Sequence, residues 1–235
     1  MAIGYNINVS ADGTSPERAA LSARAIKAKF PASSSGLYWV VNPNANSGNP
    51  FQVYCDMETD GGGWMLLVQN ASINGATKMN YTNYSLTSQT SPPTARSRAD
   101  VNKSYSILAW ADHFKNPNKP FQYMIDANDR GLWGGIWTAN DPLYTFNQTS
   151  NTATDITLST KFSDWSYNGN GIEERMPWVE TSATSNGKLT TSVSSSSAWW
   201  GTLIEASSSF SPAPWISGVS GVDNPGVIWY WMRSL

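Results

Sequence analysis

The sequence has one cysteine, one histidine and few charged side chains, and each shortage argues against a class of protein. Its single cysteine, Cys55, cannot form a disulfide within the chain. With a single histidine, His113, and a single cysteine, the chain can hardly supply the ligands of a zinc site or the residues of a nucleophile–base triad. Charged residues make up 14% of the 235 residues and the net charge is −2, which argues against a nucleic-acid partner.

Long hydrophobic runs and a signal sequence are missing as well. No apolar run reaches membrane-spanning length, so we expect no membrane insertion. The first residues lack the charged and apolar regions of a signal peptide. Together with the lack of disulfides, these features predict manufacture in a reducing cytoplasm.

Aromatic and small polar residues are abundant instead. Twelve Trp and ten Tyr accompany many Ser, Thr and Asn, a mixture typical of all-β or loop-rich proteins and unlike a helical bundle. We find no repeat and no linker, and therefore predict a single domain over residues 15–235 after an arm or short strand over residues 1–14. In the arm, Tyr5, Ile7 and Val9 alternate with polar residues. It is either an edge strand of its own sheet or an arm that docks on a neighbouring subunit.

The stretch from Phe51 to Val68 predicts a strand, a hairpin turn and a second strand. Apolar and polar residues alternate from Phe51 to Asp56, the period of a half-buried strand. Asp60-Gly61 is a strong hairpin signal because the turn needs a positive φ. Gly62 and Gly63 predict a close approach of the backbone to a bulky group, for which Trp64 is the candidate.

The rest of the chain predicts an α+β fold with irregular loops. A helix is expected from Ser15 as N-cap and Pro16 at the first position through Lys29, ending at Pro31. A second, short helix is expected over residues 104–114. Residues 70–100 are polar and are expected to form a long irregular segment at the surface. Further strands are expected at 37–41, 120–126, 132–138, 142–146, 156–158, 190–193 and 226–233.

The segment from about Ser22 to Val68 resembles the start of a fibrinogen-related domain, the family that includes fibrinogen C-terminal globes, ficolins and, more distantly, intelectins. The residues that carry the resemblance are Ile26-Lys27, Phe30-Pro31, Ser35-Gly36-Leu37-Tyr38-Trp39-Val40, Pro50-Phe51, Val53-Tyr54-Cys55-Asp56-Met57 and Thr59-Asp60-Gly61-Gly62-Gly63-Trp64. The resemblance implies a fibrinogen C-terminal-like fold, with a short N-terminal helix, a twisted and mainly antiparallel sheet, and long irregular loops.

The resemblance also implies a disulfide that this chain lacks. Animal members are extracellular and join the Cys of the Tyr-Cys-Asp strand to a Cys in the preceding helix. Here Cys55 keeps the first position, but Ala23 stands where the partner would be. We therefore expect Cys55 to be a small buried hydrophobic residue, not a reactive thiol.

Calcium-binding members of the family supply oxygen ligands from a segment that matches residues 161–171 and the two glutamates after it. Neutral serine and asparagine side chains stand here where carboxylates would be expected, although calcium favours several carboxylates. We favour an Asn-Gly turn that needs no ion, so no cofactor is required and calcium is the candidate metal. The candidate ligands are Asp164, Asn168, Asn170 and Glu173.

Aromatic residues follow this segment. The Trp199-Trp200 pair resembles a Trp-Trp pair of the family, but the Asn-x-Cys-His that helps to form its acetyl-group pocket is replaced by Thr202-Leu-Ile. Exposed aromatic rings beside polar side chains suit sugar recognition, whereas for any single Trp we favour a place in the core. The candidate ligand-binding residues are Trp199, Trp200, Trp215 and Asp223.

Catalytic motifs are absent from the sequence. It has no Gly-x-Ser-x-Gly, no His-Glu-x-x-His and no phosphate-binding loop. The carboxylates that could serve a glycosidase are the pairs Glu173/Glu174 and Asp126/Asp129, and adjacent residues on a strand point apart. We therefore predict no enzymatic activity, and expect His113 to be a surface or structural residue.

The sequence favours a protein that works by binding or assembly. Our first hypothesis is a virion structural or adhesion protein, such as a phage capsid decoration, tail or receptor-binding component, made in the host cytoplasm and exposed on the virion surface. Its partners would be other virion proteins, copies of itself, or a cell-surface glycan. The alternatives are a secreted, extracellular calcium-dependent lectin of the ficolin or intelectin type and a carbohydrate-active enzyme.

Overall fold

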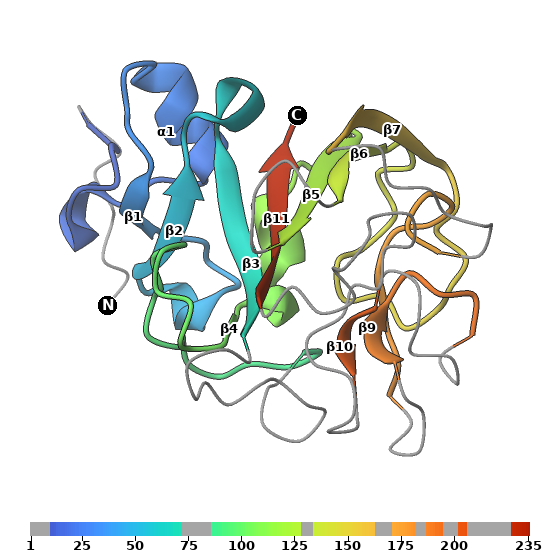
Figure 1. The fold of residues 1–235 in the computed structure, drawn as a ribbon. Coiled ribbons are helices and arrows are strands. Elements are labelled where there is room, and N and C mark those ends of the chain that lie inside the picture. The colour runs from blue at the N-terminus through green and yellow to red at the C-terminus, as the bar shows by residue number, and fades with distance from the viewer. Residues whose placement is uncertain are drawn as a thin grey trace.

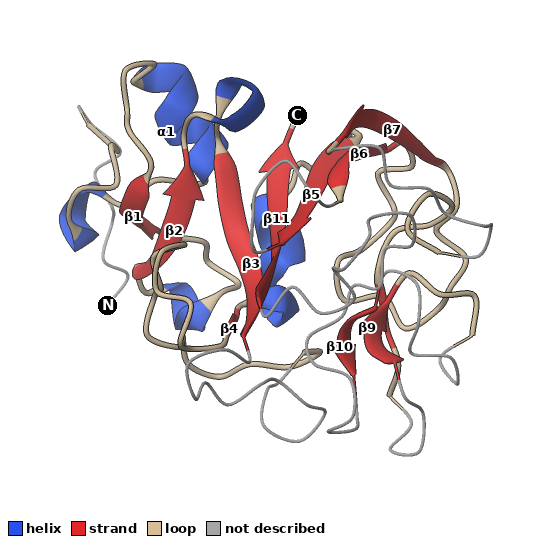
Figure 2. Ribbon diagram, in the orientation of Figure 1, coloured by secondary structure: helices blue, strands red, loops and turns tan. Residues whose placement is uncertain are grey.

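A computed structural model describes residues 10–71, 86–127, 134–162, 171–181, 187–194, 202–205 and 227–235 (Figures 1 and 2). One α-helix, α1 (Ala23–Lys29), and four 3-10 helices, η1 (Pro16–Arg18), η2 (Asn46–Gly48), η3 (Thr59–Gly61) and η4 (Leu108–Phe114), occur in these ranges. The strands are β1 (Gly36–Val40), β2 (Phe51–Asp56), β3 (Trp64–Ala71), β4 (Tyr105–Ser106), β5 (Phe121–Ala127), β6 (Gly135–Ala139), β7 (Ile156–Lys161), β8 (Trp178–Val179), β9 (Gly187–Thr190), β10 (Thr202–Glu205) and β11 (Val227–Ser234).

Seven strands form a large antiparallel sheet in the order β1-β2-β3-β11-β5-β6-β7, and the short β4 pairs with β3. The C-terminal strand β11 therefore lies between β3 and β5, in the middle of the sheet, while β1 and β7 lie at its two ends (Figure 1). A smaller antiparallel sheet, β10-β9-β8, lies below β5 to β7 in this view. The predicted α+β class with a mainly antiparallel sheet is confirmed.

The core is unusually rich in aromatic rings. Among the described tryptophans, Trp39 is half-buried, and the others are buried: Trp64, Trp110, Trp137, Trp178, Trp229 and Trp231. Tyr123 stacks on Trp137 with ring centroids 5.4 Å apart, and Phe51 contacts Trp110 at 5.2 Å. Rings of this size remove much apolar surface from water and replace the leucines that a helical core would use. For the described part of the chain, the expectation that a given Trp belongs to the core is confirmed.

The predicted N-terminal helix is wrong in its start. Ser15 and Pro16 begin only the 3-10 turn η1, and α1 begins seven residues later with Ser22 as N-cap, whose Oγ accepts the Ala25 N–H at 3.1 Å. Between them the chain is extended because Ala20 pairs with β1: its N–H donates to the Trp39 oxygen and its oxygen accepts the Val41 N–H. These bonds to β1 exclude a helical backbone at Ala20.

The glycine turn after β2 forms as predicted, but with a different partner. Asp60, Gly61, Gly62 and Gly63 all have positive φ. A Cβ atom on Gly62 would lie 2.2 Å from the Met57 carbonyl oxygen, so the close approach is to the backbone of Met57 and not to Trp64. The prediction of a tight approach is confirmed, and the assignment of Trp64 as its cause is wrong.

The predicted strand at residues 142–146 is also wrong, because this segment is a pair of turns. Lys115 Nζ donates to the Pro142 and Tyr144 oxygens at 2.6 Å each, and both carboxylate oxygens of Asp112 accept the Phe146 N–H. The helix expected over residues 104–114 is β4 followed by the 3-10 helix η4. In the described ranges, no helix has the length and the apolar character needed to cross a lipid bilayer.

Candidate functional site

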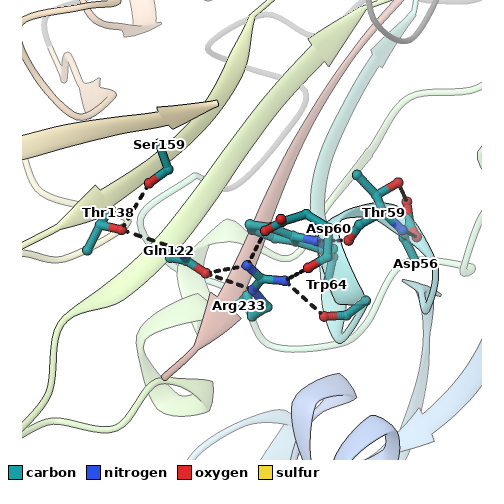
Figure 3. A network of polar contacts seen from close by, with 9 residues as sticks. Asp56, Thr59, Asp60, Trp64, Gln122, Thr138, Ser159 and Arg233 are labelled. Carbon is teal, nitrogen blue, oxygen red and sulfur yellow. Dashed lines mark hydrogen bonds and ion pairs between the residues drawn. The ribbon is translucent and has the colours of Figure 1, made fainter. Parts of the chain in front are cut away.

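Arg233, near the end of β11, is the centre of a polar network at one end of the large sheet (Figure 3). Its guanidinium donates to the Asp60 carboxylate at 2.6 Å, to the Asp60 and Gly62 carbonyl oxygens, and to Gln122 Oε1 at 2.8 Å. It also lies 4.2 Å from the centre of the Trp64 ring. Only 8% of the Arg233 side chain is exposed, so these contacts replace the water that a charged group would otherwise keep.

Gln122 continues the network across the next two strands. Its Nε2 donates to Thr138 Oγ1 on β6 at 3.4 Å, and Thr138 Oγ1 lies 3.5 Å from Ser159 Oγ on β7 (Figure 3). Gln122 pairs with both Arg233 and Thr138 across the strands, which places all three side chains on one face. We call Gln122, Thr138 and Ser159 the polar row. Gln122 and Thr138 are half-buried and Ser159 is exposed.

A second polar cluster lies on the same face at the other end of β11. The Asp126 carboxylate is fully buried and accepts the Trp231 indole N–H at 3.1 Å. Arg98 Nη2 lies 3.5 Å from the same carboxylate, and the guanidinium lies 4.2 Å from the centre of the Trp229 ring. A buried carboxylate needs such partners, because desolvation alone would disfavour its charge.

Gln69, near the end of β3, extends this second cluster. Gln69 accepts the Trp229 indole N–H at 2.7 Å and donates to the Asp100 and Lys103 oxygens, which fixes the segment that carries Arg98. Asn70 donates to the Leu203 oxygen on β10 and so links the two sheets. At this end of the sheet, β3 is followed in the chain by residues 72–85 and β5 by residues 128–133, and β11 is preceded by residues 206–226.

Of the candidate metal ligands, only Glu173 belongs to a described part of the chain. Its carboxylate lies 3.6 Å from Lys161 Nζ, and about a third of the side chain is exposed. Asp164, Asn168 and Asn170 lie outside the described residues, as do all four candidate ligand-binding residues, Trp199, Trp200, Trp215 and Asp223. Within the described ranges, no group of three or more His, Cys, Asp or Glu side chains is placed to hold a metal ion.

The described carboxylates have structural partners. Glu174 pairs with Arg175 at 3.3 Å and Glu173 with Lys161, so the two adjacent glutamates form ion pairs with different basic side chains. Burial raises the pKa of Asp112, opposed by the hydrogen bond from the Phe146 N–H, and this contact fixes the turn at residue 146. His113 is exposed, in agreement with its expected surface position, and Asp126 is enclosed by Trp231 and Arg98.

Sequence reasoning missed both the polar row and the Arg98 cluster. Strand alternation does place Gln122 on the face opposite to Phe121 and Tyr123, so the side of β5 on which Gln122 lies could have been predicted from the sequence. The pairing of Arg98 with Asp126 joins residues that no local pattern connects.

Replacing Cys55 with alanine is expected to leave ligand binding unchanged and to lower the unfolding free energy by about 1 kcal/mol, through the small cavity left by the sulfur. The side chain is completely buried on β2, and burial raises the pKa of the thiol. The native protein should therefore resist a thiol reagent that modifies it quickly in denaturant. Rapid labelling of the folded protein, or a folded variant without binding, would contradict this packing role.

Comparison with known proteins gives a family assignment for part of the chain. Residues 26–89 match the family described as the C-terminal globular domain of fibrinogen beta and gamma chains. The range includes β1, β2, the glycine turn and β3. No curated protein matches the sequence.

Two solved structures are similar to the chain as a whole. The fibrinogen-like globe domain of human ANGPTL6 is 14% identical with a TM-score of 0.48, and the match covers 91% of this chain and 95% of that domain. The corresponding domain of human ANGPTL2 is 14% identical with a TM-score of 0.43, over 88% and 95% of the two chains. The family match spans the glycine turn and the strands on both sides of it, and it shows that residues 26–89 of this chain are similar to a fibrinogen-related domain.

Proposed function

We propose that this chain is a non-catalytic adhesion module that is displayed on a virion and binds a carbohydrate. The observation that carries the binding proposal is the polar row of Gln122, Thr138 and Ser159 (Figure 3). Amides and hydroxyls that reach the surface side by side can exchange hydrogen bonds with the hydroxyl rim of a sugar. Near the row, Asn140 and Thr157 extend the same chemistry, with Asn140 Nδ2 donating to Thr157 Oγ1 at 3.1 Å.

The display part of the proposal is supported by the way the fold is held together without disulfides. Cys55 is free and buried, and Arg233 ties the glycine turn to the central strand through hydrogen bonds. A domain stabilised in this way can form in a reducing cytoplasm, where a virion is assembled, before it is exposed outside. Mass spectrometry of purified particles tests this part, and absence of the chain from particles would refute it.

The binding part is tested with the double variant Thr138→Val, Ser159→Ala. Two hydroxyls that each contribute about 1 kcal/mol to a sugar complex should, when removed, weaken binding about 30-fold. The protein would be screened against immobilised glycans and the dissociation constant measured by calorimetry. Thr160→Val is the matched control, because Thr160 is an exposed hydroxyl residue on the same strand outside the polar row.

Equal binding by the double variant and the control would exclude the polar row as the binding surface. The remaining candidates would then be Trp199, Trp200, Trp215 and Asp223. Absence of binding to every glycan in the screen would argue against the carbohydrate ligand itself. Turnover of a glycan would instead favour the carbohydrate-active enzyme.

Calcium is expected to leave the melting temperature unchanged relative to a chelator. Three of the candidate ligand positions carry a single carboxylate among them, Asp164, and the fourth, Glu173, is already paired with Lys161. Calcium that binds only the folded state would raise the melting temperature by linkage. A clear rise would therefore favour the secreted calcium-dependent lectin, the second candidate function, which the family match alone also allows.

A further inference from the structure

The hydrogen bonds of the polar row begin at a group that can only donate. Arg233 donates to Gln122 Oε1 from Nε at 2.8 Å and also from Nη2 (Figure 3). A guanidinium has no acceptor atom, and only 8% of this side chain is exposed, so its position and its role as a donor are fixed. The carbonyl end of the Gln122 amide therefore faces Arg233, and its amino end, Nε2, faces Thr138.

This orientation of the amide sets the direction of the next hydrogen bonds. Gln122 Nε2 donates to Thr138 Oγ1 at 3.4 Å, which occupies a lone pair of that oxygen and leaves its hydrogen for another acceptor. Ser159 Oγ lies 3.5 Å from Thr138 Oγ1, and the distance alone allows either hydroxyl to donate. A hydroxyl that already accepts a hydrogen bond is the better donor, because hydrogen bonds in a chain polarise one another in one direction. Thr138 is therefore expected to donate to Ser159.

A second set of contacts beside the row has the same direction. Asn140 Nδ2 donates to Asp155 Oδ1 at 2.9 Å and to Thr157 Oγ1 at 3.1 Å. A carboxylate accepts and does not donate, so Asp155 fixes the Asn140 amide with its amino end toward Thr157. Thr157 Oγ1 accepts from Asn140 in this arrangement, which leaves the hydrogen of the Thr157 hydroxyl for an acceptor outside the protein.

The two hydroxyls at the ends of these contacts are exposed on β7. Thr157 pairs with Thr138 across the strands and Ser159 contacts Thr138, so both hydroxyls lie on the face of the polar row. Each accepts a hydrogen bond from within the protein and so presents a donor to a ligand. The oxygens of a sugar that carry no hydrogen, in its ring and its glycosidic bonds, can only accept and suit such donors. The exposed carboxylate of Asp155 beside Thr157 disfavours a negatively charged acceptor.

We propose that the polar row and Thr157 present hydroxyl donors to an uncharged ligand, which binds them through its ring and glycosidic oxygens. Gln122 and Asn140 are the positioning residues, because their amides set the direction in which the hydroxyls donate. The direction of these hydrogen bonds is a property of the protein alone, whereas the class of ligand rests on the function proposed above.

Neutron diffraction from crystals exchanged into heavy water tests the direction, because it locates the deuterium of each hydroxyl. In the unmodified protein we expect the Thr138 deuterium to point at Ser159, and the Ser159 deuterium to point outward at the oxygen of a heavy-water molecule, which is the probe. Gln122→Glu is the decisive variant, since a carboxylate has nearly the same shape and still accepts from Arg233 but cannot donate to Thr138. Thr138 should then donate to the new carboxylate and Ser159 to Thr138, so that both hydroxyls turn.

The same variant tests the class of ligand. The probe is the immobilised glycan that the unmodified protein binds most tightly in the screen. Gln122→Glu should bind it at least tenfold more weakly, because the turned Ser159 hydroxyl would meet an ether oxygen with a lone pair. Gln52→Glu is the matched control: it places the same charge on a half-buried glutamine of β2, outside the polar row, and should bind normally.

Two results would overturn the proposed direction: a Ser159 deuterium that points at Thr138 in the unmodified protein, or hydroxyls that do not turn in Gln122→Glu. Equal binding by Gln122→Glu and Gln52→Glu would overturn the class of ligand. Absence of binding to every glycan would remove the class of ligand together with the proposed function, and the deuterium positions would still decide the direction. Tryptophan fluorescence of each variant controls for folding, because the described tryptophans are almost all buried.

Discussion

Replacing Gly62 with alanine is expected to leave little or no folded protein. The residue has φ 73° and ψ −167°, a backbone conformation that is open essentially to glycine alone. An added Cβ would lie 2.2 Å from the Met57 oxygen and 2.3 Å from its carbonyl carbon, and backbone atoms cannot move aside as a flexible side chain can. We expect a cost above about 4 kcal/mol, a large part of the total stability of a domain. A β-branched residue should be at least as disruptive.

Gly61 provides the matched control one residue earlier. It also has a positive φ, 81°, but a Cβ added there would meet nothing within 4 Å. Gly61→Ala should therefore cost only the local backbone strain, about 1–2 kcal/mol. The comparison is made from soluble yield and from urea denaturation. A Gly62→Ala protein with the same denaturation midpoint as Gly61→Ala would show that the Met57 contact is not tight in solution.

The glycine turn also shows how far the sequence can predict this fold. Asp60-Gly61 and the strands on both sides of it follow from local rules, since turn chemistry and alternation act over a few residues. The partner of Gly62 does not follow, because the approach of Met57 depends on how the chain bends between the two strands. The sequence therefore predicted that the position needs glycine without predicting the reason.

The start of α1 was predicted wrongly for a related reason. By local rules a helix can begin either at Ser15-Pro16 or after Ser22. The prediction placed the start at Ser15-Pro16, because a serine followed by proline is the stronger signal. In the structure, Ala20 makes its hydrogen bonds with Trp39 of β1 and with Val41 directly after it, and these contacts override helix propensity. The choice between the two starts was decided by a strand that begins 16 residues after Ala20, at Gly36.

The candidate site was predictable only where a single strand determines it. Alternation in β5 gives the side on which Gln122 lies, but strand order decides that Thr138 and Ser159 stand beside it. Likewise, Asp126 and Trp231 are 105 residues apart and meet only because β11 returns to the centre of the sheet beside β5. Contacts of this kind need the topology, which one sequence does not contain.

Replacing Arg233 with methionine is expected to lower the unfolding free energy by roughly 2–4 kcal/mol. The ion pair with Asp60 contributes little of this, because 49% of the Asp60 side chain is exposed and water screens the pair. The larger part comes from the acceptors that lose their donor: the Asp60 and Gly62 carbonyl oxygens and Gln122 Oε1. Loss of the stacking on Trp64 adds to it. Thermal or urea denaturation measures the difference.

Two further substitutions separate the causes. Arg18→Met removes an arginine that pairs with Asp12 at the surface, where 46% of its side chain is exposed, and should change stability by less than about 0.5 kcal/mol. Arg233→Lys keeps the charge but has no planar fork, so it cannot reach the turn carbonyls and Gln122 together. We expect it to be nearly as unstable as Arg233→Met. If Arg233→Lys is instead as stable as the unmodified chain, the positive charge beside Asp60 holds the turn to β11. The hydrogen bonds of the guanidinium would then contribute little to stability.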